Sequence, residues 1–274
     1  MHATPVERSR RDRGILYAAA FLRALATGMA GILLGICLAR LGLPAVPAVA
    51  ETVALHTIFE LQRATGQRPV RVHLCRLSTA AGIELLRGAR REGLPVTADV
   101  SILHVHGVDT DVGQFDSNWR LDPPLRTQRD RAAIRAALAD GTLDAICSDH
   151  APAALEDKLL PFGEAGVGAT GLETLLSLLL AWAQSDKVPV LRALSTVTCG
   201  PARVLGEDTG TLLVGRKADV VLFDPNETWR VNSESLLSYG KNTPYLGREL
   251  AGRVRATIVG GEMRFERAPV GAAA

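Results

Sequence analysis

The hydrophobic and polar positions of the chain predict short apolar strands separated by helices. The helical stretches repeat apolar residues with a helical period and stop at glycines such as Gly66, Gly93 and Gly141. The predicted strands cover residues 70–75, 95–100 and 145–148. The predicted helices cover residues 51–65, 80–91, 129–139, 171–184 and 190–202. Strands and helices that alternate at these distances form βαβ units around a parallel sheet.

The number of βα units limits the architecture. Roughly three to five units can be counted, whereas a closed (β/α)8 barrel needs eight. We therefore expect an α/β fold built on an incomplete (β/α)8, TIM-type barrel. The connection at residues 107–129 contains Pro123-Pro124 and is expected to be an extended loop.

The character of the chain changes after Gly206. Short strands are expected at residues 210–215 and 218–224, and a hairpin at 256–265 with its turn at Gly260-Gly261. These elements predict a small C-terminal β-subdomain. The expected organisation is a divergent apolar and basic segment at 1–38, a partial barrel at 39–205, and the β-subdomain with its tail at 206–274.

The N-terminal segment joins a basic run to a long apolar stretch, the order found in secretory signals and membrane anchors. Arg23 and Arg40 interrupt the stretch, which is also too long for the apolar part of a signal. We expect residues 15–38 to form helices that cover the open part of the barrel, because an open sheet edge invites aggregation. A membrane or export role remains the alternative.

Composition narrows the class of protein. Hydrophobic residues make up 47% of the chain and aromatic residues only 4%, so the core should be aliphatic. The net charge is +2, and the only basic cluster is the short run near the N-terminus. The sequence therefore does not predict a basic surface patch that binds nucleic acid. The four cysteines are far apart, without a CxxC pair. Buried free thiols in a reducing, cytoplasmic compartment are the expected state.

Candidate chemistry lies where the strand at 145–148 ends. The apolar run stops at Ser148-Asp149-His150, and Pro152 prevents the strand from continuing. In a (β/α)8 barrel, polar side chains at the carboxyl end of a strand are usually catalytic. A turn capped by Asp149 is the structural alternative.

Eight blocks of the chain, in order, resemble class I dihydroorotases, which belong to the cyclic amidohydrolase superfamily. The most specific are His73-Leu74-Cys75-Arg76-Leu77-Ser78-Thr79 and Ser148-Asp149-His150-Ala151-Pro152. The others lie at residues 41–51, 96–100, 122–126, 171–174, 215–221 and 241–247. Residues 140–144 lead into the Asp149 block and count as part of it. The resemblance covers roughly residues 40–267 and implies an incomplete barrel of the amidohydrolase kind.

The resemblance implies zinc at the mouth of the barrel and a metal-activated hydroxide that opens or closes a cyclic amide. Asp149 matches the Asp that holds metal and moves the proton in that family. The other ligand positions are altered, because Arg76 stands where the family has a ligand His and residues 15–39 contain no histidine. A guanidinium cannot donate a lone pair to zinc. Asp149 is then the only ligand position left, as a vestigial base, and no cofactor is expected.

The resemblance also implies the substrate-binding positions, namely Asp122, His150 and Gly168. Asp122 replaces the family's Asn and would repel an anionic substrate, and Ala153 replaces a substrate-binding His. We expect Arg76 to form a salt bridge with Asp149 or Asp99, since a buried carboxylate without metal needs a counter-charge.

Histidines at two further places, one single and one pair, are candidates for metal ligands. His73, between two apolar residues in a predicted strand, is expected to be a core histidine with satisfied hydrogen bonds rather than a ligand. The pair His104-Val105-His106 has the spacing of a metal-binding pair but lacks identifiable partners, so it is not expected to bind metal.

The sequence thus favours a dihydroorotase-like protein of pyrimidine biosynthesis that has lost its metal site and its N-terminal part. The resemblance to inactive dihydroorotase homologues implies a structural partner, aspartate carbamoyltransferase, in a hetero-oligomer. A working zinc-dependent dihydroorotase that interconverts N-carbamoyl-aspartate and dihydroorotate is the alternative. A non-functional truncated remnant is the third hypothesis.

Overall fold

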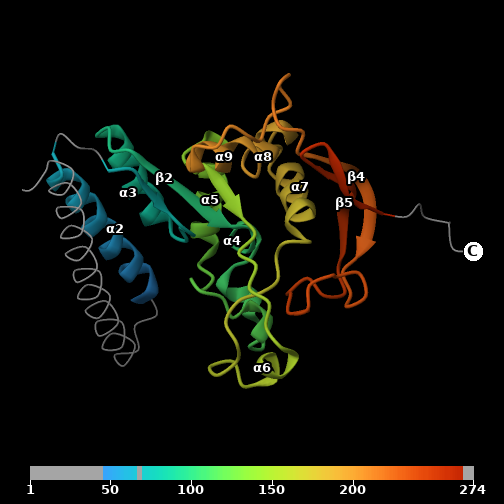
Figure 1. The fold of residues 1–274 in the computed structure, drawn as a ribbon. Coiled ribbons are helices and arrows are strands. Elements are labelled where there is room, and N and C mark those ends of the chain that lie inside the picture. Colours follow the sequence, from blue (N-terminus) through green and yellow to red (C-terminus); the bar gives the residue numbers. More distant parts are fainter. Residues whose placement is uncertain (1–45, 67–69, 268–274) are drawn as a thin grey trace, which may run out of the picture. The chain divides into compact units, whose positions relative to one another are not determined.

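The computed structural model describes residues 46–66 and 70–267 of the chain (Figure 1). The chain divides into two compact units, residues 1–60 and 61–274. The described part of the first unit, residues 46–60, belongs to helix α2 (Val46–Ala64), which confirms the helix predicted at 51–65 with an earlier start. The expectations for residues 15–38 lie outside the described residues. The predicted domain boundaries at 38/39 and 205/206 stay predictions.

The second unit contains the predicted parallel sheet. Its strands are β1 (Val72–Leu74), β2 (Val96–Ser101) and β3 (Ala145–Cys147), in the order β1-β2-β3. His73 lies opposite Thr97, and Asp99 opposite Ala145. An isolated parallel bridge joins His150 to Ala169, so the chain continues the sheet direction beyond β3. These strands confirm the open α/β array.

Alternation along β2 gives the sheet two different faces. Val96, Ala98 and Val100 are buried, whereas Thr97 and Asp99 are only half-buried. Successive side chains of a strand point to opposite faces. The sheet therefore has one apolar face and one polar face.

Two long helices follow β1 and β2 in sequence. They are α3 (Ala80–Arg91), which begins where Thr79 accepts a hydrogen bond from the Gly82 amide at 2.9 Å, and α5 (Gln128–Asp140), which begins at a Thr127–Asp130 capping box. α3 contacts β2 and α5. Their buried residues include Ile83, Leu86, Ile134 and Leu138, which confirms an aliphatic core. Trp182 is the largest fully buried side chain among the described residues.

The later helices correct the sequence prediction in part. They are α6 (Leu155–Leu159), α7 (Leu175–Ser185), α8 (Val190–Ser195) and α9 (Cys199–Leu205). The single helix predicted at 190–202 is wrong. It is interrupted because the carbonyl of Thr196 accepts a hydrogen bond from the Ile146 amide of β3 at 2.9 Å, and is thus taken from the helix.

Of the predictions for two connecting segments, the first is confirmed in part and the second is wrong. The loop at 107–129 contains two short 3-10 helices, η1 (Asp109–Val112) and η2 (Ser117–Trp119), and is preceded by the unpredicted helix α4 (Ile102–His106). These helices have one turn or little more, too short for a hydrophobic period to reveal. The strand predicted at 210–215 is absent, because Gly210 and Gly215 have φ angles of 73° and 85° that turn the chain at both ends.

The C-terminal β-subdomain is confirmed as an antiparallel sheet. It consists of β4 (Val220–Arg230), β5 (Glu249–Val259) and β6 (Glu262–Glu266) in that order. Gly260 and Gly261 form the predicted tight turn, with φ angles of 61° and 84°. The sheet is attached to α7, where the hydroxyl of Ser177 donates to the Gly252 carbonyl at 2.6 Å.

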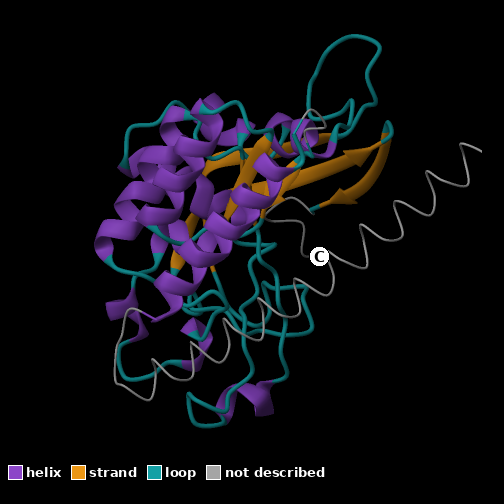
Figure 2. Cartoon of the chain, turned by 90° about the vertical axis from the view of Figure 1, so that its left-hand side faces the viewer, coloured by secondary structure: helices purple, strands orange, loops and turns teal. Residues whose placement is uncertain are grey.

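Within the second unit, the long loops after β2 and β3 extend to the same side, with α6 near their tip (Figures 1 and 2). Among residues 46–66 and 70–267, no helix has the length and apolar character needed to cross a membrane.

His106 in α4 gives the fold a pH dependence. Its Nε2 donates to the Leu178 carbonyl at 2.8 Å, and burial, aided by the nearby charges of Arg135 and Arg131, lowers the pKa of His106 to about 4. The unfolded imidazole has a pKa near 6.5, so between about pH 6.5 and 4 only the unfolded chain takes up this proton. The contribution of His106 to stability is complete above pH 6.5 and decreases as the pH falls.

We expect His106→Gln, which keeps a hydrogen-bond donor, to remove this dependence. The free energy of unfolding of the original chain should lose about 3 kcal/mol more than that of the variant between pH 7 and 4. Urea unfolding of both proteins across this pH range measures the difference. If the free energy of unfolding changed equally with pH in both proteins, His106 would not be the source of the pH dependence.

Candidate functional site at the ends of the parallel strands

The polar face of the sheet brings together side chains from all three strands. The register places His73 of β1, Thr97 and Asp99 of β2, and Cys147 of β3 on the same face. Cys75 follows β1 two positions after His73 and continues this side of the chain. The opposite face is apolar and buried, so the chemistry of the sheet is confined to one side.

Asp99 is the centre of this group. One carboxylate oxygen of Asp99 lies 2.9 Å from Nε2 of His73, and the other accepts the Arg76 backbone amide at 2.7 Å. Nδ1 of His73 lies 2.8 Å from the hydroxyl of Thr97. Both ring nitrogens of His73 therefore have partners, which confirms that its hydrogen bonds are satisfied. The residue is half-buried and does not lie in the core, so the position predicted from its apolar neighbours is wrong.

The cysteines differ from their predicted surroundings. Cys75, Cys147 and Cys199 are free, but Cys75 is exposed rather than buried. Partial burial and the charge of Asp99 raise the pKa of Cys75, while Arg76 acts in the opposite direction. Burial, followed by the charges of Asp99 and Asp149, raises the pKa of Cys147 more strongly. Neither thiol is activated as a nucleophile.

His73, Cys75 and Asp99 form a group that could hold a metal ion, because their ligand atoms all lie within 4.8 Å of one another. The sequence did not reveal this group. Asp99 is distant from the other two along the chain, and only the strand register brings it beside them.

Arg76 and Asp149 meet in the ion pair expected from the sequence. Nη1 of Arg76 lies 3.4 Å from a carboxylate oxygen of Asp149 and donates to the Asp122 carbonyl at 2.6 Å. Arg76 and Asp149 follow β1 and β3 with φ angles of 57° and 48°, an uncommon backbone conformation for residues other than glycine. The Asp99 carboxylate accepts a hydrogen bond from the backbone amide of Arg76 and not from the Arg76 guanidinium.

The three proposed substrate-binding residues lie in different surroundings. Asp122 is exposed and meets Arg76 through its carbonyl. His150 uses Nδ1 to accept the amides of Gly171 and Leu172 at 3.3 and 3.4 Å, so this ring orients the following loop. Gly168 has a φ of 103°, and a Cβ there would lie 2.4 Å from that of Ala151. Their roles in binding substrate stay predictions.

The loop after Asp149 is held by two side chains that the sequence did not single out. Nζ of Lys158 donates to the carbonyls of Ser117, Gly166 and Gly168 at 2.9, 2.7 and 2.7 Å. The amide of Asn242 accepts from the Ala153 backbone at 2.9 Å and donates to Ala151 and Gly168. Asn242 lies in one of the resemblance blocks, which was the available signal. Lys158 had none, because isolated lysines are usually exposed.

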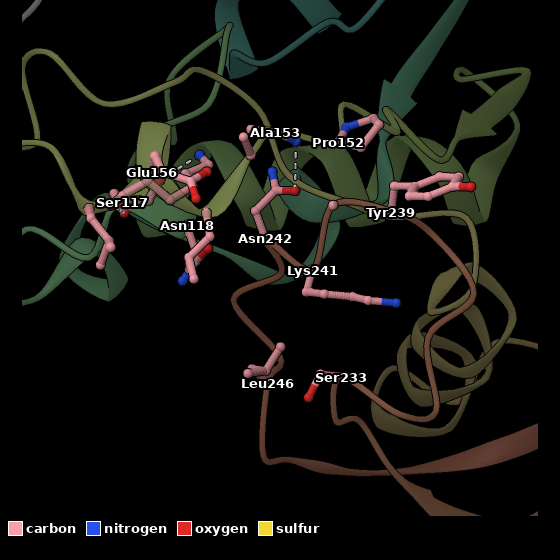
Figure 3. A pocket seen from close by; sticks show the side chains of 15 residues that line it. Ser117, Asn118, Pro152, Ala153, Glu156, Ser233, Tyr239, Lys241, Asn242 and Leu246 are labelled. Atoms are coloured by element: carbon pink, nitrogen blue, oxygen red, sulfur yellow. Dashed lines mark hydrogen bonds between the residues drawn. The ribbon is translucent and has the colours of Figure 1, made fainter.

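A cavity of about 860 Å³ lies beyond this loop (Figure 3). Its walls come from residues 117–118, 152–159 and 233–246. The amide of Asn242 bonds to Ala153 at its edge, and Tyr239 and Lys241 lie on the same segment as Asn242 (Figure 3). Neither Asp149 nor Asp99 lines this cavity.

His104 and His106 do not form a metal pair. Nε2 of His104 faces the Pro124 carbonyl at 3.3 Å, while that of His106 bonds to Leu178. Residues two apart on a helix point in different directions. The helix α4 therefore directs the two rings toward separate segments.

Comparison with known proteins gives the chain a family. Residues 24–264 match the model of the amidohydrolase family. The chain belongs to this family. Dihydroorotases from Anaeromyxobacter dehalogenans (strain 2CP-1) and Caldanaerobacter subterraneus subsp. tengcongensis are 42% and 39% identical over 234 residues, which is 85% of this chain and 53% of each relative. The chain thus spans about half the length of the curated relatives it matches, and it is a dihydroorotase-like amidohydrolase.

Solved structures support the fold. The L-hydantoinase (dihydropyrimidinase) from Arthrobacter aurescens aligns with a TM-score of 0.75 and 25% identity, over 81% of this chain and 50% of that one. The D-hydantoinase (dihydropyrimidinase) from Thermus sp. aligns with a TM-score of 0.73 and 23% identity, over 80% of this chain and 49% of that one. These similarities confirm the α/β fold class with part of an amidohydrolase barrel.

The family implies a metal ion such as zinc. The donor atoms around Asp149 decide whether such an ion fits there. The nearest side-chain partner of Asp149 is the Arg76 guanidinium, a permanent cation without a lone pair. Zinc needs three or more converging donor atoms. The surroundings of Asp149 do not fit this ion.

The Arg76–Asp149 pair predicts a measurable energetic coupling. The Arg76 side chain is 42% exposed and that of Asp149 is 16% exposed, so solvent screens the pair only in part. A double-mutant cycle of Arg76→Met and Asp149→Asn should give a coupling of about 0.5–1 kcal/mol in urea unfolding. The control pair Arg255–Asp224, with 62% and 32% exposure, should give less. A larger coupling in the control pair would contradict the role given to Arg76.

Lys158 should be important for stability. Lys158→Met removes three charge-assisted hydrogen bonds, although the Ser117 and Gly168 carbonyls keep a second donor in Arg120 and Asn242. We expect a loss on the order of 3 kcal/mol in the free energy of unfolding. Lys241→Met is the matched control, because Lys241 donates to the Leu236 carbonyl alone among the bonds described. Equal losses in the two variants would show that the three-carbonyl site is not the cause.

Proposed function

We propose that this chain is a cytoplasmic, dihydroorotase-like protein of de novo pyrimidine biosynthesis that is catalytically inactive and acts as a structural partner of aspartate carbamoyltransferase. The observation that carries the proposal is the guanidinium of Arg76, 3.4 Å from Asp149. Relatives named dihydroorotase, about 40% identical, supply the link to this pathway.

The loss of activity follows from the charges around Asp149. The pair with Arg76 neutralises the carboxylate and places a fixed cation beside it, where a second cation would be repelled. A general base without a metal or another electrophile does not activate an amide carbonyl for attack by water. The thiols of Cys75 and Cys147 offer no alternative nucleophile, since the pKa of each is raised.

The substrate side of the site agrees with this view. Asp122 is exposed, and its own backbone carbonyl accepts a hydrogen bond from Arg76. Carbamoyl-aspartate and dihydroorotate are anions, so a carboxylate in place of an amide would repel them. Ala153 bonds to Asn242 through its backbone amide and brings no imidazole to the substrate.

The structural role is supported by what the chain retains. The aliphatic core, the loop held by Lys158 and Asn242, and the C-terminal sheet remain in place around the altered site. Large apolar side chains such as Leu155, Leu159 and Leu237 are more than two-thirds exposed. Exposed apolar groups of this kind are used in contacts between proteins.

The test combines assembly and turnover. The chain is co-expressed with aspartate carbamoyltransferase from the same organism, and the complex is separated by size-exclusion chromatography. We expect co-elution in a fixed ratio and no interconversion of carbamoyl-aspartate and dihydroorotate, with or without added zinc. Arg76→His, which returns an imidazole but not the other ligands, should remain inactive.

Two results would contradict the proposal. Turnover that Asp149→Asn abolishes would identify a working zinc-dependent dihydroorotase. Separate elution of a well-folded chain from the transferase would exclude the structural partnership, and with no turnover it would favour the truncated remnant.

A further inference from the structure

We propose that His73, Cys75 and Asp99 bind a zinc-class divalent ion between β1 and β2, through a ligand set that does not include Asp149. The three residues supply an imidazole nitrogen, a thiolate and a carboxylate oxygen within 4.8 Å of one another. This inference does not depend on the proposed function, since an inactive chain and an active one would both hold the ion.

The donor types select the ion. Zn²⁺ accepts nitrogen, sulfur and oxygen ligands, whereas Mg²⁺ and Ca²⁺ prefer oxygen alone. Ligand bonds of about 2.0–2.3 Å in a tetrahedron place neighbouring donor atoms about 3.3–3.8 Å apart. Donor atoms that lie within 4.8 Å of one another are near this spacing.

The backbone already arranges the ligands. His73 and Cys75 lie two positions apart on the same side of β1, and the parallel register places Asp99 on the same face of β2. The two polar partners, Nε2 of His73 and Oδ2 of Asp99, converge at 2.9 Å. Cys75 is exposed, so the site opens to solvent and a water molecule can complete the coordination.

The surroundings have the supporting contacts that metal sites need. Metal-binding histidines usually donate their second ring N–H to an oxygen, which fixes the orientation of the ring. The hydroxyl of Thr97, 2.8 Å from Nδ1 of His73, is placed to accept this bond. The Arg76 backbone amide holds Oδ1 of Asp99 at 2.7 Å and leaves Oδ2 directed toward His73.

The charges also balance. A thiolate and a carboxylate together neutralise a divalent ion. The Arg76 guanidinium bonds to Asp149 and to the Asp122 carbonyl, whereas only the backbone amide of Arg76 bonds to Asp99.

The experiment uses Co²⁺ as a spectroscopic substitute for Zn²⁺. The full chain, reduced and freed of metal by chelation, is titrated with Co²⁺ and then with Zn²⁺. We expect a thiolate-to-cobalt charge-transfer band in the near ultraviolet that saturates at one ion per chain and disappears when zinc displaces cobalt. Elemental analysis after dialysis should find one zinc per chain.

The variants identify the ligands. Cys75→Ser, at an exposed position, should abolish the charge-transfer band while the circular dichroism spectrum is unchanged. Thr97→Val should weaken zinc binding about ten- to hundred-fold through the loss of the orienting bond. Cys199→Ser, a cysteine in α9, and Asp149→Asn are the controls and should bind cobalt as the original chain does.

Three results would overturn the inference. They are the absence of a charge-transfer band in the original chain, its persistence in Cys75→Ser, and its loss in Asp149→Asn. The third would place the ion at Asp149. None of these measurements uses turnover or assembly with another protein, so the inference and the proposed function can fail separately.

Discussion

The guanidinium of Arg76 decides what the end of the parallel sheet can do. It lies between the carboxylate of Asp149 and the carbonyl of Asp122, and it joins the segments that follow β1 and β3 to the loop before α5. A permanent charge at this point stabilises a carboxylate that would otherwise need another cation. The same charge disfavours a second cation beside Asp149.

The two faces of the sheet explain why the site remains ordered. The buried face consists of apolar side chains such as Val96, Ala98 and Val100 under the helices, and it holds the strands in register. The register in turn fixes Asp99 beside His73 and under the Arg76 amide.

The sequence predicted the elements with a strong period and the residues with a strong local signal. The helix at 80–91 and the turn at Gly260-Gly261 are confirmed, as is a salt bridge of Arg76, for which the sequence left Asp149 and Asp99 as alternative partners. The break between α8 and α9 was not, because it depends on a hydrogen bond from Ile146, which lies far away along the chain.

The candidate site shows the same limit. The exposure of Cys75 and its approach to Asp99 depend on the register between β1 and β2 and on how much of the polar face is covered. The role of Lys158 depends on three carbonyls that converge from two loops. Hydrophobic periodicity carries no information on either arrangement, whereas it describes the apolar face well.

The hydrogen bonds around Asp99 set the cost of binding an ion there. His73 is bonded to Asp99 and Thr97, and the cost of burying the carboxylate is met by the bond to His73 and the Arg76 amide. An ion that enters must replace the contact between His73 and Asp99, while the bonds to Thr97 and the Arg76 amide persist. Binding of an ion is therefore opposed by the loss of one hydrogen bond, the one between His73 and Asp99. The rest of the site does not have to be rebuilt.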